Sequence, residues 1–209
     1  MEEDLVAEIV AAGVRDPRLH EAVRALPRAD FVLSELQSRA YLDEPLPIPH
    51  GQVTTQPSLV AKMIDALALT GSERELEVGT GYGWQTALLA RLAAFVWSVE
   101  RFADIAETAR ANLARHGVEN AEVVVGDGSR GLAEHAPYDA ILVSAAFPKV
   151  PEPLREQLTE GGRLVQPIGP GGHDEVVLLA KAAGQLERRG YVTGASFVCL
   201  YDEHGFEPE

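Results

Sequence analysis

The sequence predicts an α/β fold built on a doubly wound, mostly parallel sheet with N-terminal helices and added C-terminal antiparallel strands. Between residues 74 and 167, short apolar segments alternate with amphipathic ones, which is typical of repeated strand–helix units. In Gly79-Thr80-Gly81-Tyr82-Gly83, glycines at alternate positions follow an apolar segment, as expected where a strand turns sharply into a helix. After residue 174 the strand-like segments have no helices between them, which indicates antiparallel strands at the sheet edge.

The first thirty residues predict helices, because apolar residues recur at helical spacing over 5–10 and 19–26. Asp16-Pro17 indicates a helix start, with Asp as N-cap and Pro at the first helical position, and Leu26-Pro27 ends that helix. Residues 41–57 hold four prolines among apolar residues, which predicts an extended, ordered loop. Long loops of this kind in compact domains are often functional.

The remaining elements alternate along the chain. We expect helices over 58–69, 84–93, 102–115 and 151–158, and strands over 74–78, 95–99, 121–125, 138–144 and 162–167. Further strands are expected over 174–182, 184–189 and 196–201. A helical and loop segment over 1–57 packs on an α/β core over 58–209, and the two form effectively a single domain.

Composition restricts the partners and the compartment. With 18 basic and 32 acidic residues the net charge is -14, which opposes nucleic-acid binding because such a surface repels phosphates. No apolar run of 18 residues occurs, so no membrane partner is expected. The acidic start, Met1-Glu2-Glu3-Asp4, differs from a signal peptide, and the single Cys199 excludes an internal disulfide framework. We therefore expect a cytoplasmic protein.

Two acidic residues stand where an open α/β sheet places its ligands, at the carboxyl ends of strands. Glu100 ends the apolar run 95–99 about 20 residues after the glycines, the position of a carboxylate that binds ribose hydroxyls. Asp127, in Gly126-Asp127-Gly128, ends the run 123–125 and suits the exocyclic amine of adenine, with small neighbours leaving room for the ring. A solvated strand end and an ordinary turn are the alternative interpretations.

The glycine spacing G-x-G-x-G differs from the G-x-G-x-x-G of dinucleotide sites, and no G-x-x-x-x-G-K-[ST] occurs. Glu77, just before the first glycine, is poorly suited to phosphates and well suited to a cation, through a water or an ammonium group. A cofactor with an adenosine, an amino-acid tail and a positive centre fits these features, and S-adenosylmethionine is the natural candidate. The histidines are scattered without metal-ligand spacing, so no metal site is expected.

Several segments along nearly the whole chain resemble one family. They are LPRADFV at 26–32, AYLDEPLPI at 40–48, GQVTTQP at 51–57, EVGTGYGWQT at 77–86, SVER at 98–101, and blocks at 126–128, 138–141 and 197–200. The chain is identified by them as similar to the protein-L-isoaspartate (D-aspartate) O-methyltransferases, class I enzymes with a Rossmann-like methyltransferase fold. The segments before the glycine turn are the more specific ones, because other methyltransferases share the turn.

The resemblance implies transfer of a methyl group from S-adenosylmethionine to the free carboxylate of L-isoaspartyl or D-aspartyl residues in damaged proteins and peptides. S-adenosylhomocysteine is the other product, and the methyl ester then cyclises to a succinimide, which begins repair. Members of the family are generally cytosolic and mostly monomeric. A carboxylate is ionised at neutral pH, so its attack needs no general base, and hydrogen-bond donors that hold it in a dry pocket suffice.

The resemblance also implies site residues. The expected catalytic residue is Thr55, and the expected substrate-binding residues are Val53, Thr54, Gln56, Pro57 and Val198. The expected cofactor-binding residues are Glu77, Gly79, Thr80, Gly81, Tyr82, Gly83, Gln85, Thr86, Glu100, Asp127 and Gly128.

Within these segments, the chain departs from the family pattern at four positions. The family usually has Thr at 53, Ser at 55, a small Ser or Thr at 82 and Tyr at 84, where this chain has Val53, Thr55, Tyr82 and Trp84. The side chain of Tyr82 either covers the cofactor or points to solvent. Two alternatives stay open at this point: a methyltransferase of the same fold acting on another carboxylate, and a non-catalytic cofactor-binding relative.

Overall fold

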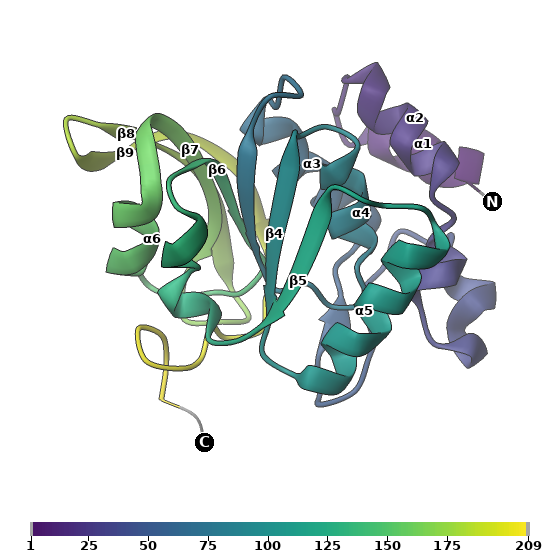
Figure 1. The fold of residues 1–209 in the computed structure, drawn as a ribbon. Coiled ribbons are helices and arrows are strands. Elements are labelled where there is room, and N and C mark those ends of the chain that lie inside the picture. Colours follow the sequence, from purple (N-terminus) through teal and green to yellow (C-terminus); the bar gives the residue numbers. More distant parts are fainter. Residues whose placement is uncertain (1, 208–209) are drawn as a thin grey trace.

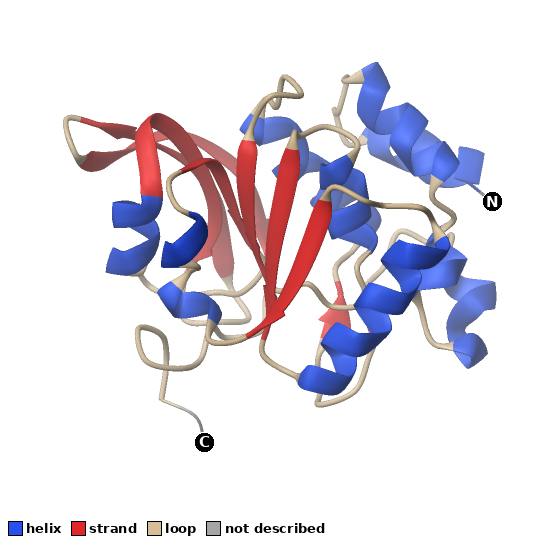
Figure 2. Cartoon of the chain, viewed as in Figure 1, coloured by secondary structure: helices blue, strands red, loops and turns tan. Residues whose placement is uncertain are grey.

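The computed structural model describes residues 2–207 and contains a seven-stranded sheet with helices on both faces (Figures 1 and 2). The strands are β3 (Arg74–Val78), β4 (Phe95–Glu100), β5 (Ala121–Val125), β6 (Tyr138–Val143), β7 (Leu158–Ile168), β8 (Asp174–Ala182) and β9 (Gln185–Ala195). Their order is β5-β4-β3-β6-β7-β8-β9. The first five strands are parallel, and β8 and β9 are antiparallel additions, which confirms the predicted fold class.

The helices cover the sheet unequally. They are α1 (Glu2–Ala11), α2 (Pro17–Ala25), α3 (Pro57–Leu67), α4 (Trp84–Ala90), α5 (Ala103–Arg115) and α6 (Glu152–Gln157), with short 3-10 helices η1 (Arg28–Phe31), η2 (Ser34–Arg39), η3 (Gly128–Arg130) and η4 (Ala133–His135). In Figure 1, α3, α4 and α5 lie on one face of the sheet and α6 on the other, while α1 and α2 lie outside α3 and α4.

Most predicted boundaries agree with these elements to within a few residues. The side chain of Asp16 accepts a hydrogen bond from the Arg18 backbone N–H, which confirms the predicted N-cap of α2. α3 ends earlier than expected, because Ala68 adopts a left-handed φ of 48°. β7 and β9 are longer than predicted, because both pair with β8 along most of its length. Within the predicted loop 41–57, the short strands β1 (Leu46–Pro47) and β2 (Val53–Thr54) form an antiparallel hairpin.

The strand predicted over 196–201 is wrong. Cys199 makes an isolated bridge to Ala146 and Tyr201 makes one to Phe206, and the rest of the segment is irregular. Its donors have other acceptors, since the Phe197 N–H binds the Asp174 carboxylate at 3.0 Å and the Leu200 N–H binds the Ala146 carbonyl at 2.8 Å. Residues 196–201 therefore have the apolar pattern of a strand but lie against the residues after β6 and do not form a strand of the sheet.

Two large apolar clusters form most of the core, one on each face of the sheet. The first joins residues of α1, α2, α3 and α4, such as Leu5, Ile64 and Leu88, so the segment before residue 57 shares its core with the α/β part. The second cluster lies on the α6 face and includes Tyr138 and Leu154. The predicted division into residues 1–57 and 58–209 stays a prediction, and the two parts share this cluster.

β3 is the middle one of the five parallel strands, and the strand order reverses there. From β3 the chain passes through α4 to β4 on one side and later returns to β6 on the other side. In doubly wound sheets the loops at such a point part from each other and leave a crevice at the carboxyl ends of the strands. The candidate site lies there.

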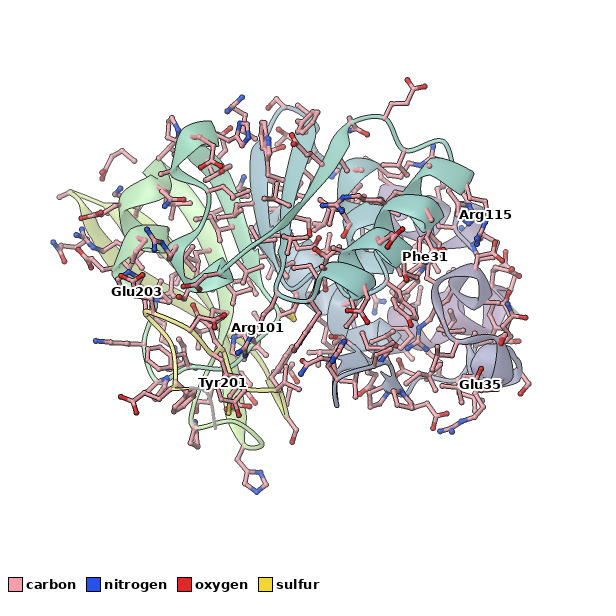
Figure 3. The ribbon with its side chains drawn as sticks, turned by 60° about the horizontal axis from the view of Figure 1, so that its bottom comes forward. Phe31, Glu35, Arg101, Arg115, Tyr201 and Glu203 are labelled. Carbon is pink, nitrogen blue, oxygen red and sulfur yellow. The ribbon has the colours of Figure 1, made fainter. Side chains whose placement is uncertain are left out.

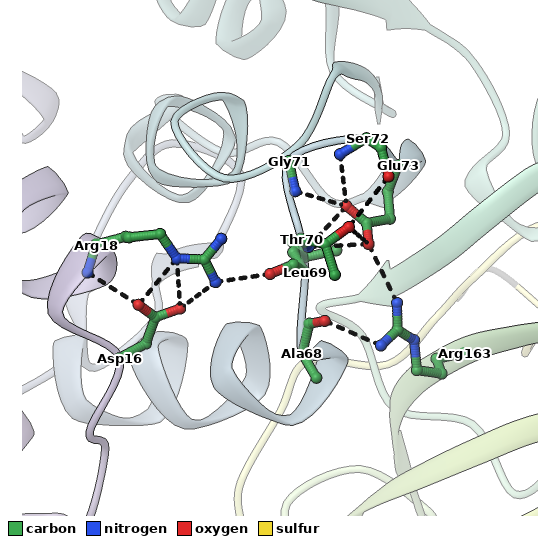
Figure 4. Close-up of polar contacts among 9 residues, drawn as sticks. All are labelled: Asp16, Arg18, Ala68, Leu69, Thr70, Gly71, Ser72, Glu73 and Arg163. Atoms are coloured by element: carbon green, nitrogen blue, oxygen red, sulfur yellow. Dashed lines mark hydrogen bonds and ion pairs between the residues drawn. The ribbon is translucent and has the colours of Figure 1, made fainter.

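At the opposite, amino end of β3, the buried Glu73 carboxylate organises the turn from α3 (Figure 4). It accepts hydrogen bonds from the backbone N–H groups of Thr70, Gly71 and Ser72, and Arg163 on β7 lies 3.3 Å away. Burial alone would raise the pKa of Glu73, but these donors outweigh it and lower the pKa. Glu73 therefore carries a charge that links the turn to β7.

Glu75 on the same strand is different, because it is fully buried and neither carboxyl oxygen has a hydrogen-bond partner among residues 2–207. Burial, together with the nearby charges of Glu77 and Glu73, raises the pKa of Glu75 well above 4.5. The folded protein therefore holds Glu75 neutral at pH values where the unfolded chain ionises it, and the free energy of unfolding falls as the pH rises through that range.

We expect Glu75→Met to raise the free energy of unfolding by about 1–3 kcal/mol at pH 8, because it removes an unpaired polar group from the core. The gain should be smaller at pH 5, where the unfolded chain also retains part of this proton. Urea unfolding at both pH values measures the difference, and Glu122→Gln at an exposed position of β5 is the control. Equal or lower stability of Glu75→Met at pH 8 would contradict this account.

Candidate active site

A cleft lies at the carboxyl ends of β3, β4 and β6, where the sheet order reverses. The space between its walls, including space open to solvent, is about 1000 Å³. Five segments far apart in the sequence contribute most of its lining. They are the β1–β2 hairpin with the residues that follow, the turn between β3 and α4, and residues 99–102, 144–145 and 198–202.

Most predicted site residues line this cleft. They are Val53, Thr54, Thr55, Gly79, Thr80, Gly81, Tyr82, Gly83, Gln85, Glu100, Gly128 and Val198. Gln56, Pro57, Glu77, Thr86 and Asp127 lie outside the lining. All except Pro57 are next in sequence to a residue that forms it. The cleft thus brings together the glycine turn at 79–83, predicted to bind the cofactor, and the loop 41–57, predicted to bind the substrate and called the substrate loop below.

The glycine turn needs glycine for conformational reasons. Gly79, Gly81 and Gly83 have backbone φ angles of 95°, 55° and 89°, a region that residues other than glycine rarely adopt. The turn leads into α4 directly, with Gly83 as its N-cap residue. Gly79 and Gly81 therefore present backbone to the cleft without a side chain, whereas a Cβ at the buried Gly83 would lie 3.4 Å from Ala109 of α5.

Glu100 at the end of β4 supports this turn from the side. Its carboxylate accepts hydrogen bonds from the backbone N–H of Gly81 at 2.9 Å and of Phe102 at 3.1 Å. Burial raises the pKa of Glu100, and the two N–H donors oppose that effect. A carboxylate has about four acceptor positions, so Glu100 retains acceptor capacity toward the cleft that it lines.

Glu77 lies beneath the cleft and is fully buried. Its carboxylate accepts hydrogen bonds from Gln85 on α4, Thr86 on α4 and Ser98 on β4. Burial raises the pKa of Glu77 to about 7, even though these three donors act in the opposite direction. Glu77 therefore fixes α4 to the centre of the sheet and titrates near neutral pH.

Gln85 connects the buried Glu77 to residues that line the cleft. Its amide nitrogen donates both to Glu77 and to the hydroxyl of Ser144, which follows β6. Its amide oxygen is buried and has no hydrogen-bond partner among residues 2–207. Gln85 therefore links the buried Glu77 carboxylate to the end of β6 through its amide nitrogen.

The Gly126-Asp127-Gly128 segment behaves partly as expected. Gly128 lines the cleft, and a Cβ there would lie 2.4 Å from a methyl carbon of Val78, so the close approach to β3 requires glycine. The Asp127 carboxylate accepts hydrogen bonds from the Ser129 backbone at 2.8 Å and from the Glu203 backbone at 3.1 Å. Asp127 therefore caps η3 and ties down the C-terminal segment.

Arg28 organises the substrate loop from below. This side chain is 1% exposed, and its guanidinium donates to the backbone oxygens of Ala40, Leu42, Glu44 and Thr55 and to the hydroxyl of Thr54. These bonds fix both ends of the loop at one group. The hydroxyl of Thr55, by contrast, has no hydrogen-bond partner within the described part of the chain, and this residue lines the cleft.

Gln56 and Pro57 form the start of α3, as its N-cap residue and first helical position. The Gln56 amide donates to the Asp43 carboxylate at 2.7 Å, and Asp43 also accepts from the Ser58 backbone at 2.8 Å. These contacts join the two ends of the loop a second time. Their direct contact with a substrate stays a prediction.

The structure resolves the question about Tyr82, whose side chain is only 8% exposed. It packs with Ile48 of the substrate loop and Ile105 of α5, against Leu33 and Phe102. Tyr82 therefore closes one side of the cleft and does not point to solvent. Trp84, the other departure, donates its indole N–H to the Leu26 carbonyl at 3.0 Å, and Arg28 lies 5.8 Å over its ring.

Residues of the loop after β4 contact two other segments that line the cleft, the loop 41–57 and residues 198–202. Arg101 lies over the ring of Tyr201 at 5.4 Å and pairs with Asp202 at 3.4 Å, and Figure 3 shows Arg101 next to Tyr201. Phe102 stacks on His50 of the substrate loop with ring centroids 4.3 Å apart, and the His50 imidazole lies 2.9 Å from the Asp104 carboxylate. The substrate loop and the C-terminal segment are therefore held by neighbouring residues.

Sequence reasoning missed Ser144, Arg101 and Arg28 as site residues. Ser144 follows β6, so the rule that ligands bind at the carboxyl ends of strands was a signal for it. Arg101 and Arg28 were part of quoted motifs without a role of their own. Only the tertiary contacts show that Arg28 lies under Thr54.

Comparison with known proteins agrees with this architecture. The model of the family "Protein-L-isoaspartate(D-aspartate) O-methyltransferase (PCMT)" matches residues 1–205. The chain belongs to this family. A protein-L-isoaspartate O-methyltransferase from Methanoculleus marisnigri is 49% identical over 100% of this chain and 94% of its own length. One from Koribacter versatilis is 44% identical over 94% of this chain and 88% of its own.

Solved structures of the isoaspartate methyltransferase family share the fold. One protein-L-isoaspartate O-methyltransferase has a TM-score of 0.85 at 32% identity over 95% of this chain, which spans 65% of that protein. A putative family member from Plasmodium falciparum, solved with S-adenosyl-L-homocysteine, has a TM-score of 0.79 at 22% identity, covering 94% of this chain and 96% of its own. Within residues 2–207 no helix is long and apolar enough to cross a membrane, and no His, Cys, Asp and Glu cluster has metal-binding geometry.

Proposed function

We propose that this cleft transfers a methyl group from S-adenosylmethionine to the free carboxylate of isoaspartyl residues, as family membership implies. The observation that carries the proposal is that the glycine turn with Glu100 and the hydroxyl of Thr55 line the same cleft. The chain is an S-adenosylmethionine-dependent methyltransferase, and isoaspartyl-containing proteins are its substrates. D-aspartyl residues are the second expected acceptor.

The cleft residues fit the cofactor. Gly128 lines the cleft in close contact with Val78 of β3, and Glu100 lines it beside the glycine turn with acceptor capacity left. Glu100 binds the ribose hydroxyls, and Asp127 with Gly128 binds the adenine. Glu77 and Thr86 act through Gln85 and α4 instead of directly, while Gly79, Thr80, Gly81, Tyr82 and Gly83 form the wall around the amino-acid tail.

The substrate loop holds the acceptor. The cofactor supplies a methyl group on a sulfonium, so that a carboxylate oxygen forms the new C–O bond while the C–S bond breaks and its electron pair stays on sulfur. No proton moves in this step, because the acceptor carboxylate is already ionised. The hydroxyls of Thr55 and Thr54 orient that carboxylate, with Val53, Val198, Gln56 and Pro57 shaping the walls, and orientation is the main contribution of such a site.

We further infer that the protein acts as a cytoplasmic monomer without nucleic-acid or membrane partners. The net charge of -14 supports the absence of nucleic-acid binding, since the surface repels phosphates. Sedimentation of the purified protein measures its oligomeric state directly.

The central test is methyl transfer from labelled S-adenosylmethionine to an isoaspartyl peptide, with the same peptide carrying normal aspartate as control. We expect label in the isoaspartyl peptide, released as methanol in base, and none in the control. No transfer under conditions where the Methanoculleus marisnigri relative is active would refute the proposed function.

For the cofactor, we expect Glu100→Ala to raise the dissociation constant of S-adenosylhomocysteine more than tenfold, because each charge-assisted hydrogen bond contributes about 1.5–3 kcal/mol. Calorimetry measures the constant, with Glu122→Ala as the matched exposed control. A constant unchanged from wild type would remove Glu100 from the ribose site.

For the acceptor, we expect Thr55→Val to lower kcat/KM for the isoaspartyl peptide by roughly 10- to 100-fold, since orientation of the carboxylate is lost. Cofactor affinity should stay within threefold of wild type. Thr55→Ser keeps the hydroxyl and should retain most of the activity. If the valine and serine variants turn over equally, the Thr55 hydroxyl has no part in catalysis.

A further inference from the structure

Arg28 is a buried cation that forms no ion pair with a carboxylate among residues 2–207. Its side chain is 1% exposed, and every hydrogen bond that it makes goes to a neutral backbone carbonyl or to the Thr54 hydroxyl. Its Nε is buried without a partner among residues 2–207. Burial of a charge without a paired opposite charge is costly, so a group of this kind needs an explanation.

The two carboxylates whose charges act on Arg28, those of Asp43 and Glu44, are hydrogen-bonded to other residues. Asp43 accepts hydrogen bonds from Gln56 and Ser58 at the start of α3, and Glu44 pairs with Arg39 at 2.8 Å. Both act on Arg28 only from a distance, where they offset part of the effect of burial. Burial lowers the pKa of Arg28 to about 10, so the guanidinium remains charged at neutral pH.

Thr54 transmits this charge to the cleft. An arginine nitrogen can only donate, so the 3.0 Å bond from Arg28 occupies a lone pair of the Thr54 hydroxyl oxygen. The hydroxyl proton is then free for another acceptor, and Thr54 lines the cleft next to Thr55. Arg28 therefore sets Thr54 as a hydrogen-bond donor toward the substrate position.

We propose that Arg28, acting through Thr54, is the positioning residue that makes the site select an ionised carboxylate over its neutral methyl ester. This inference rests on the proposed function. The acceptor carboxylate supplies the missing opposite charge next to the loop, which strengthens its binding. Methyl transfer then converts that anion into a neutral ester, so the attraction disappears in the product and the ester is released.

The same charge affects substrate binding more than the rate of the chemical step. The carboxylate loses its charge as it attacks the sulfonium methyl, so a nearby cation stabilises the bound substrate more than the transition state. Loss of Arg28 therefore raises KM for the isoaspartyl peptide and has less effect on kcat.

The test compares two peptides that differ only at the acceptor, one with isoaspartate and one with the neutral β-linked isoasparagine. Their dissociation constants are measured by calorimetry on protein saturated with S-adenosylhomocysteine. We expect wild type to prefer the anionic peptide at least tenfold, and Arg28→Met to reduce that ratio to threefold or less. Arg110→Met is the control, because Arg110 binds only the Val123 carbonyl on β5, and it should keep the ratio.

A purely structural role of Arg28 predicts a different result, in which both peptides bind more weakly by the same factor and the ratio is unchanged. That outcome would overturn this inference while leaving the proposed function intact. A wild-type protein that does not methylate the isoaspartyl peptide would instead overturn the proposed function and this inference together.

If Arg28→Met does not fold, as judged by its thermal unfolding, Thr54 provides the deciding pair. Thr54→Val removes the hydroxyl at nearly constant size, and Thr54→Ser keeps it. A lowered ratio in the valine variant with a retained ratio in the serine variant supports the inference, and equal ratios in both variants overturn it.

Discussion

The structure depends on a turn between β3 and α4 that only left-handed backbone angles permit. Gly79, Gly81 and Gly83 supply these angles. Because the turn is this tight, α4 starts directly above the sheet, and Glu77 beneath it can bind two α4 side chains. Glu100 on β4 then holds the middle of the turn through Gly81. The cleft wall is therefore backbone fixed by two buried carboxylates.

The same turn connects the two parts of the active site. Trp84, the first residue of α4, binds the Leu26 carbonyl and lies under the Arg28 guanidinium, which in turn holds the substrate loop. Tyr82 packs against Ile48 of that loop. The two large residues that depart from the family pattern therefore form contacts between the cofactor turn and the substrate loop. Their size fills space at this junction and leaves the cleft open.

The sequence was sufficient for the features that local chemistry determines. Alternating elements, the glycine turn and Glu100 at a strand end are visible as patterns, because turn angles and strand ends have characteristic residues. The partners of Glu77 were not visible, since Gln85, Thr86 and Ser98 come from different elements that only the tertiary fold brings together. The segment 196–201 has a strand-like composition, but its hydrogen bonds go to Asp174 and Ala146, a competition that no local pattern records.

The cleft is assembled from residues that span almost the whole chain, from Phe31 to Asp202. β3, β4 and β5 are adjacent in the sheet and also early in the sequence, so this half can pair while later residues are still being synthesised. The second wall requires Ser144 after β6, and the cover requires residues 198–202. A growing chain on the ribosome can therefore hold a partly formed sheet long before all residues that line the cleft have been synthesised.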